Sequence, residues 1–124
     1  MVITIDHKNY LCNTKEDFGD CIRDILSGYS GEIWISERGL PEDLPCLGIL
    51  TDEEQAVINY FARDGRNYVT AGDREKEGFC IFCDGQYEVH ACQVIEKSQA
   101  EKGILAFYEN GELPAMLQWE TVSE

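Results

Sequence analysis

Basic residues are scarce in this chain: 10 Lys and Arg stand against 24 Asp and Glu among 124 residues, so the formal net charge is −14. A surface of that sign repels nucleic acids and anionic lipids, and it speeds the encounter with basic proteins. The few basic side chains are also interleaved with acids, as in Asp73-Arg74-Glu75-Lys76-Glu77. The composition therefore argues against a nucleic-acid-binding or membrane-binding protein and is compatible with a basic protein partner.

Long apolar runs are missing as well. No segment approaches the roughly 20 apolar residues that a membrane-spanning helix needs. The first residues, Val2-Ile3-Thr4-Ile5, alternate like a strand and lack the basic region and cleavage site of a signal peptide. We therefore expect a cytoplasmic protein, in which the six cysteines stay reduced.

The sequence also lacks the common catalytic motifs. It has no Walker loop, no Rossmann glycine set and no His-Glu-x-x-His, and its Gly28-Tyr29-Ser30-Gly31 lacks the last glycine of a nucleophile elbow. Only His7 and His90 offer an imidazole base. Carboxylates are so numerous that no pair stands out as acid and base, which leaves a small carboxylate hydrolase as a weak third alternative. We predict no enzymatic activity and no cofactor.

Four residues near the middle of the chain form the sharpest chemical candidate, namely Cys80, Cys83, His90 and Cys92. Such soft ligands could hold a tetrahedral zinc ion. Cys80 and Cys83 lie in a strand-like run, however, and an odd separation on a strand points two side chains to opposite faces. We interpret the cysteines as buried thiols and keep a zinc-stabilised protein-interaction module as the alternative function.

Apolar residues at helical spacing predict two helices. Residues 14–28 begin with a threonine that can cap a helix and end at Gly28, where we expect a left-handed conformation. Residues 96–110 carry a second stripe that Gly111 terminates. Gly103 lies inside this stripe, and we expect it to allow a close approach of the helix to a sheet.

The other segments are typical of short strands joined by tight turns. Residues 51–62 are ambiguous, and we prefer a strand because Asp64-Gly65 is a hairpin turn signal, as is Asp84-Gly85. The expected strands are residues 2–5, 32–36, 46–50, 56–61, 68–70, 79–83, 86–92 and 116–122. The prediction is one α+β domain spanning residues 1–124, with an antiparallel sheet of about seven or eight short strands packed by two helices.

The last third of the chain combines an alanine-bearing helix, aromatic residues, a glycine, a proline and a final strand with Trp and an acid. The segments are Gln99-Ala100, Phe107-Tyr108-Glu109-Asn110-Gly111-Glu112-Leu113-Pro114 and Leu117-Gln118-Trp119-Glu120. This part resembles the tail of the type-1 immunity-protein family of bacterial polymorphic toxin systems. Tyr60-Phe61, Asp64-Gly65-Arg66 and Ala71-Gly72 fit the middle hairpin of that family more loosely.

The resemblance implies an immunity protein that binds and neutralises the C-terminal domain of a cognate toxin, often a nucleic-acid deaminase or a nuclease. Such toxins have basic substrate clefts, which suits an acidic inhibitor. The residues that match the family are expected to be structural: Tyr60, Ala100, Phe107, Gly111, Pro114 and Trp119. For the toxin-binding surface we predict an acidic loop and the adjoining hairpin: Asp73, Glu75, Glu77, Asp84 and Tyr87.

Overall fold

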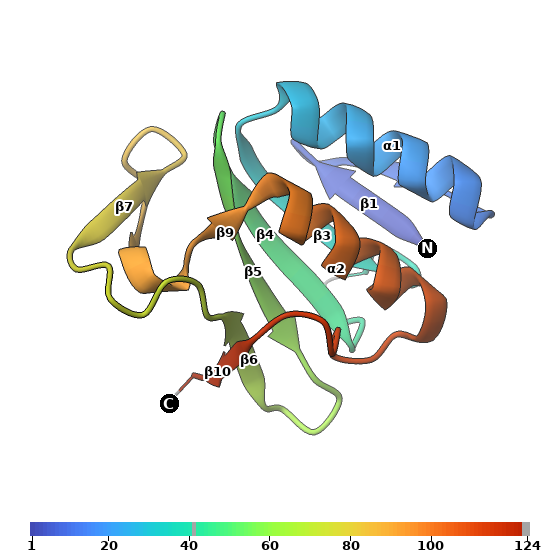
Figure 1. The fold of residues 1–124 in the computed structure, drawn as a ribbon. Helices are drawn as coiled ribbons and strands as arrows, with labels where there is room; N and C mark the ends of the chain where they lie inside the picture. Colours follow the sequence, from blue (N-terminus) through green and yellow to red (C-terminus); the bar gives the residue numbers. More distant parts are fainter. Residues whose placement is uncertain (41, 123–124) are drawn as a thin grey trace.

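The structure is a computed structural model that describes residues 1–40 and 42–122. It has two helices, an eight-stranded antiparallel sheet and a separate two-stranded sheet (Figure 1). This arrangement confirms the predicted α+β fold class. Across the part of the chain that the structure describes, no helix has the length and apolar character needed to cross a membrane.

The strand order of the large sheet is β10-β6-β5-β4-β3-β1-β2, and β9 pairs with one end of β5. Strands β3 to β6 therefore form a meander in which neighbours along the chain are neighbours in space. The strands are β1 (Val2–Ile5), β2 (Lys8–Leu11), β3 (Gly31–Ser36), β4 (Cys46–Thr51), β5 (Gln55–Phe61), β6 (Asn67–Thr70), β9 (Ile95–Glu96) and β10 (Trp119–Thr121).

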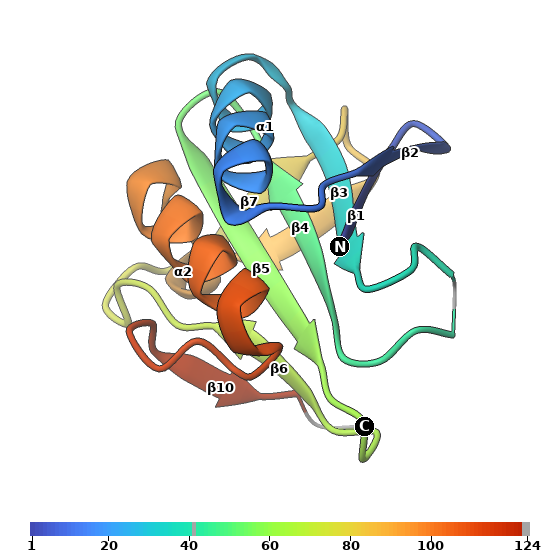
Figure 2. The ribbon, with the colours of Figure 1, turned by 90° about the vertical axis from the view of Figure 1, so that its right-hand side faces the viewer.

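Both helices, α1 (Lys15–Gly28) and α2 (Lys97–Asn110), cover the same face of the sheet (Figures 1 and 2). They pack against each other, with the rings of Phe18 and Tyr108 centred 4.7 Å apart. The main core lies between the helices and the sheet. Its buried residues include Phe18, Ile22, Ile33, Ile35, Ile49, Ile58, Ile104 and Phe107. This face holds the alternate residues of β3, β4 and β5 because side chains on a strand point to opposite faces in turn.

The second face of the sheet is covered only in part. A hairpin made of β7 (Phe79–Phe82) and β8 (Tyr87–His90) forms the two-stranded sheet and stands away from the helices (Figure 1). A second, smaller core lies under this hairpin, and its buried residues are Leu50, Val57, Val69, Phe82 and Val94. Gly39, in the loop after β3, lies against Val2 at the far end of this face, and between these two covers Trp34 is 40% exposed.

The helix ends were predicted with mixed success. Thr14 caps α1 as expected, because its Oγ1 accepts a hydrogen bond from the Asp17 amide at 3.1 Å. The helix also ends at Gly28 as predicted, but Gly28 is itself helical, and the chain leaves through Tyr29 in an extended conformation, with φ −107°. The prediction of a left-handed Gly28 was therefore wrong, since the chain runs directly from the helix into β3. Gly111 does adopt the left-handed conformation after α2, with φ 69°.

The expectation for Gly103 also needs correction. A Cβ at this position would lie 2.4 Å from Cδ1 of Leu117. The close approach is therefore to the segment that follows α2, and not to the sheet.

Three elements were not predicted, namely β2, β9 and the 3₁₀ helix Ala91–Gln93. The 3₁₀ helix takes the end of the expected strand 86–92, and the expected strand 116–122 is shortened to Trp119–Thr121. β2 pairs with β1 through a turn at Asp6 and His7. These two residues have φ values of 50° and 65°, a region that glycine adopts more readily than other residues.

Candidate functional site

The uncovered part of the second sheet face is the most distinctive surface of the molecule. Trp34 of β3 lies directly opposite Thr4 of β1 and Gly48 of β4, and Cys46 lies opposite Phe61 of β5. Residues opposite each other in a ladder share a face. We call the surface formed by these five residues the open face.

Trp34 lies flat at the centre of the open face. A Cβ on Gly48 would come within 2.9 Å of Cζ3 of the Trp34 ring, so the absence of a side chain there makes room for the indole. The ring reaches across β4 to Phe61, with the two rings stacked at 5.7 Å and 28°. The Trp34 side chain is nevertheless 40% exposed. One face of the indole is therefore supported by the protein while part of the ring remains available to a partner.

Two exposed leucines border the open face. Leu40 and Leu44 belong to the β3–β4 loop, of which residues 37–40 and 42–45 are described. Each of them lines a hollow that Trp34 also lines, one of about 320 Å³ with Leu40 and one of about 250 Å³ with Leu44. A large aromatic residue ringed by apolar side chains is typical of the centre of a protein–protein interface.

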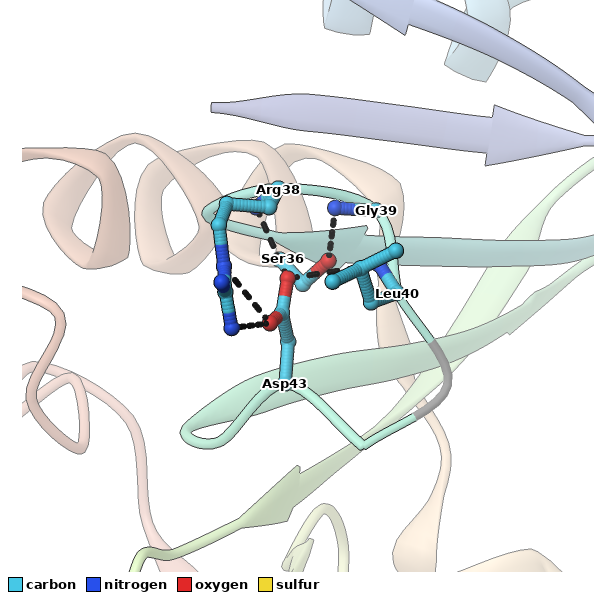
Figure 3. Close-up of polar contacts among 5 residues, drawn as sticks. All are labelled: Ser36, Arg38, Gly39, Leu40 and Asp43. Carbon is cyan, nitrogen blue, oxygen red and sulfur yellow. Dashed lines mark hydrogen bonds and ion pairs between the residues drawn. The ribbon is translucent and has the colours of Figure 1, made fainter.

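The β3–β4 loop is held in shape by the buried carboxylate of Asp43 (Figure 3). Its Oδ2 accepts hydrogen bonds from the backbone amides of Arg38 at 2.8 Å and Leu40 at 3.2 Å. Its Oδ1 accepts from Nε and Nη2 of the Arg38 guanidinium, at 3.1 and 2.8 Å. The hydroxyl of Ser36 accepts from the Gly39 amide at 2.9 Å. These contacts hold the described residues 36, 38–40 and 43 in place without a partner.

The ionised form of Asp43 stabilises this loop, so its contribution to stability should depend on pH. Burial acts to raise the pKa of Asp43, but the hydrogen bonds from Arg38 and Leu40 outweigh it and hold the pKa below its ordinary 3.8. The stabilisation is therefore fully present above that value and is lost as the pH falls through the lowered pKa. We expect Asp43→Asn to lower the melting temperature at pH 7 and the deficit to shrink below about pH 4.

The measurement is thermal unfolding of Asp43→Asn and of the wild-type protein between pH 7 and pH 2. Glu42→Gln, an exposed change in the same loop, is the matched control and should stay close to wild type at every pH. A deficit of Asp43→Asn that does not change with pH would contradict the role assigned to the ionised carboxylate.

An acidic cleft of about 570 Å³ adjoins Trp34 on the side of the hairpin. Its lining includes three carboxylates, Asp6, Glu32 and Asp84, and one imidazole, that of His7. Glu32 is held at both oxygens: Oε1 accepts from the Trp34 indole N–H at 2.6 Å, and Oε2 accepts from a tyrosine hydroxyl at 2.9 Å. The cleft is thus an organised, negatively charged extension of the open face.

The negative charge of the cleft also shifts the pKa of neighbouring groups. The pKa of Tyr87 is raised by its hydrogen bond to Glu32 and by the charge of that carboxylate. The pKa of Tyr29 is raised by burial and by its hydrogen bond to Asp6. Burial, with the charges of Glu32 and Asp84, raises the pKa of the Cys83 thiol. All three groups therefore stay protonated at neutral pH, burial being the main cause for Tyr29 and Cys83 and the Glu32 carboxylate the main cause for Tyr87.

The structure separates the predicted toxin-binding residues into two groups. Asp84 lines the acidic cleft, and Tyr87 donates its hydroxyl hydrogen to Glu32 at the same place. The loop residues Asp73, Glu75 and Glu77 are exposed but precede β7, at the opposite end of the hairpin from Asp84. Asp73 instead lines a different hollow, of about 610 Å³.

The four candidate zinc ligands are not brought together. His90 lies opposite Phe79 on the exposed side of the hairpin, with the rings centred 4.8 Å apart. Cys80 and Cys83 both pack against the small core, so the expectation of opposite faces was wrong: β7 ends at Phe82, and Cys83 lies in the turn with φ 56°. Cys92 lies in the 3₁₀ helix. Within residues 1–40 and 42–122 there is no group of three or more His, Cys, Asp or Glu placed to hold a metal ion.

The residues that carry the family resemblance form one packed cluster around Tyr60. Its ring makes edge-on contacts with Phe107 at 6.0 Å and Trp119 at 6.5 Å, and its hydroxyl donates to the Gly111 carbonyl at 3.2 Å. The Trp119 indole donates to the Pro114 carbonyl at 2.8 Å. Ala100 is fully buried nearby in the same core. The cluster joins α2, the C-terminal segment and the sheet.

Sequence reasoning missed Trp34, Glu32 and the two leucines as surface residues. A signal for the first two was present in Glu32-Ile33-Trp34-Ile35-Ser36, because strict alternation puts the tryptophan on the polar side, with Glu32, and opposite the two isoleucines. No comparable pattern marks Leu40 and Leu44, which lie in an irregular loop.

No protein-family model matches this chain, and no curated protein matches it either. The likeness of the C-terminal third to type-1 immunity proteins therefore rests on the residues quoted above.

Proposed function

We propose that this chain is an immunity protein that binds and neutralises a basic toxic protein. The observation that carries the proposal is the amount of negative charge that has no basic side chain paired with it. Among the described residues, five ion pairs engage five of 23 Asp and Glu, the 24th being Glu124. The pairs are Lys15–Glu109, Arg23–Asp20, Arg23–Glu101, Arg38–Asp43 and Arg66–Asp64.

A surface of this kind steers a basic partner toward it and speeds association. Charge alone gives little affinity, because exposed ion pairs contribute about 0–1 kcal/mol each. The open face adds the second requirement, a partly exposed aromatic ring set in an apolar border. The negative charge and the open face together support a function in binding a basic protein surface with high affinity. The resemblance of the C-terminal third adds the class of that partner, a toxin that acts on nucleic acid through a basic cleft.

A co-expression experiment tests the proposed function. The candidate toxin is the C-terminal domain of a large protein encoded next to the gene for this chain, as the resemblance implies. It is induced in bacteria alone, with this chain, and with an unrelated acidic protein of similar size and charge. We expect growth to stop in the first and third cultures and to recover in the second, with the two proteins copurifying. Equal recovery with the unrelated acidic protein, or no recovery with this chain, would contradict the proposal.

A further inference from the structure

Two exposed apolar surfaces could receive a partner. One is the outer side of the β7–β8 hairpin, where Phe79 is 58% exposed and Ile81 is also exposed. The carboxylate on that side is that of Glu88, which lies opposite Ile81 in the ladder and has no ion pair among the described residues. The other is the open face, where three hollows, two apolar and one acidic, meet at Trp34. Charge and shape together favour the open face.

We propose that the basic partner docks on the open face and places an arginine side chain over Trp34, with its guanidinium beside Glu32. The inference rests on the proposed function, since it takes the partner to be a basic protein. It goes further in assigning the surface, the anchor residue and the chemistry of the partner's side chain.

The chemistry of the cleft suits a planar cation. An indole ring attracts cations through the negative charge above its face, and a guanidinium stacks on it better than an ammonium does. The Glu32 carboxylate already accepts from the Trp34 indole and the Tyr87 hydroxyl, which fixes its direction and leaves lone pairs for a further donor. A guanidinium that stacks on the ring could therefore also donate to Glu32.

The rest of the cleft adds to the attraction. Asp84 contributes charge from the hairpin turn, and Asp6 from the β1–β2 turn, where its Oδ1 accepts from the Tyr29 hydroxyl at 3.1 Å. These carboxylates come from separate elements and surround one volume. Among the described residues that line the cleft, His7 is the one basic side chain.

The apolar border would hold the flanking part of the partner. Leu40 and Leu44 lie next to Trp34, so a side chain beside the arginine can bury apolar surface against them. Because Asp43 holds the backbone amide of Leu40, little ordering of that residue is needed on binding. Preorganisation of this kind improves affinity by lowering the entropy lost in the complex.

Binding of an inactive variant of the toxic domain, measured as association and dissociation rates, tests the inference. We expect Trp34→Ala to weaken binding about thirtyfold, mainly through faster dissociation. Leu44→Ala, which leaves the strands untouched, should weaken it several-fold. Phe79→Ala removes an aromatic side chain of greater exposure from the other surface and should change the affinity less than about twofold. Circular dichroism of each variant confirms that it is folded.

Replacing the three acids of the 73–77 loop by lysine separates steering from docking. We expect this change to slow association without changing dissociation, because the loop lies away from Trp34. If the wild-type protein binds and both Trp34→Ala and Leu44→Ala bind as tightly as it does, docking on the open face is contradicted while the proposed function stands. A failure of the wild-type protein to bind would contradict both the proposed function and the docking on the open face.

Discussion

Phe107→Ala is expected to lower the free energy of unfolding by about 3–5 kcal/mol. Phe107 is only 1% exposed and packs edge-on against Tyr60 at 6.0 Å. Its removal would leave a cavity between α2 and the sheet, next to the tyrosine that ties Gly111 to β5. The surrounding backbone belongs to regular elements and can collapse only partly into that space.

Chemical denaturation at neutral pH measures this effect. Tyr10→Ala is a suitable control, because this aromatic side chain is 45% exposed on the edge strand β2 and its loss should change stability by about 0.5 kcal/mol or less. In a binding assay, Phe107→Ala should lose affinity only in proportion to the unfolded fraction. A stable Phe107→Ala variant that fails to bind would show that the cluster contacts the partner, contrary to its buried position.

Gly72→Ala is expected to destabilise the protein by about 3 kcal/mol or more. A Cβ on Gly72 would lie 2.0 Å from the carbonyl oxygen of Val94, and the Gly72 amide donates to the Cys92 carbonyl at 2.7 Å. Both neighbours are backbone atoms, so the clash cannot be relieved by rotating a side chain. The two segments joined here lead into and out of the β7–β8 hairpin.

Gly28→Ala is the matched control, since the same atoms are added where nothing lies within 4 Å. It lies in α1, where alanine is the better helix former, so stability should rise by about 0.5–1 kcal/mol. Opposite signs for the two variants, read from thermal or chemical unfolding, are the expected result. Equal effects would mean that the approach of Gly72 to Val94 is not maintained in solution.

Much of the secondary structure could be predicted because its signals are local. The apolar stripes of α1 and α2 and the cap at Thr14 depend only on near neighbours in the chain. Asp64-Gly65 likewise identified the β5–β6 hairpin. β2 was missed because its turn consists of Asp6 and His7. Both adopt positive φ, whereas a hairpin turn of this kind is normally recognised in a sequence by a glycine.

The candidate site was harder to predict because it depends on which residues other elements leave uncovered. Alternation put Trp34 on the polar side of its strand, but a neighbouring hairpin could have buried it, as the β7–β8 hairpin buries Val57 on the same face. Gly48 showed no local sign of its role either. Gly48 leaves room for the Trp34 indole of the neighbouring strand, and this role is visible only once the register of the two strands is known.

The strand order also bears on how the chain reaches this structure. The meander from β3 to β6 pairs strands that are neighbours along the chain, so it can form with little loss of loop entropy. β10 must instead return to β6 across the hairpin and α2, pairing Trp119 with Thr70. Contacts so distant in sequence form slowly. We therefore expect the sheet to be nucleated by its middle strands and completed at the edge formed by β10. A chain still emerging from the ribosome could then form the open face before β10 has been synthesised.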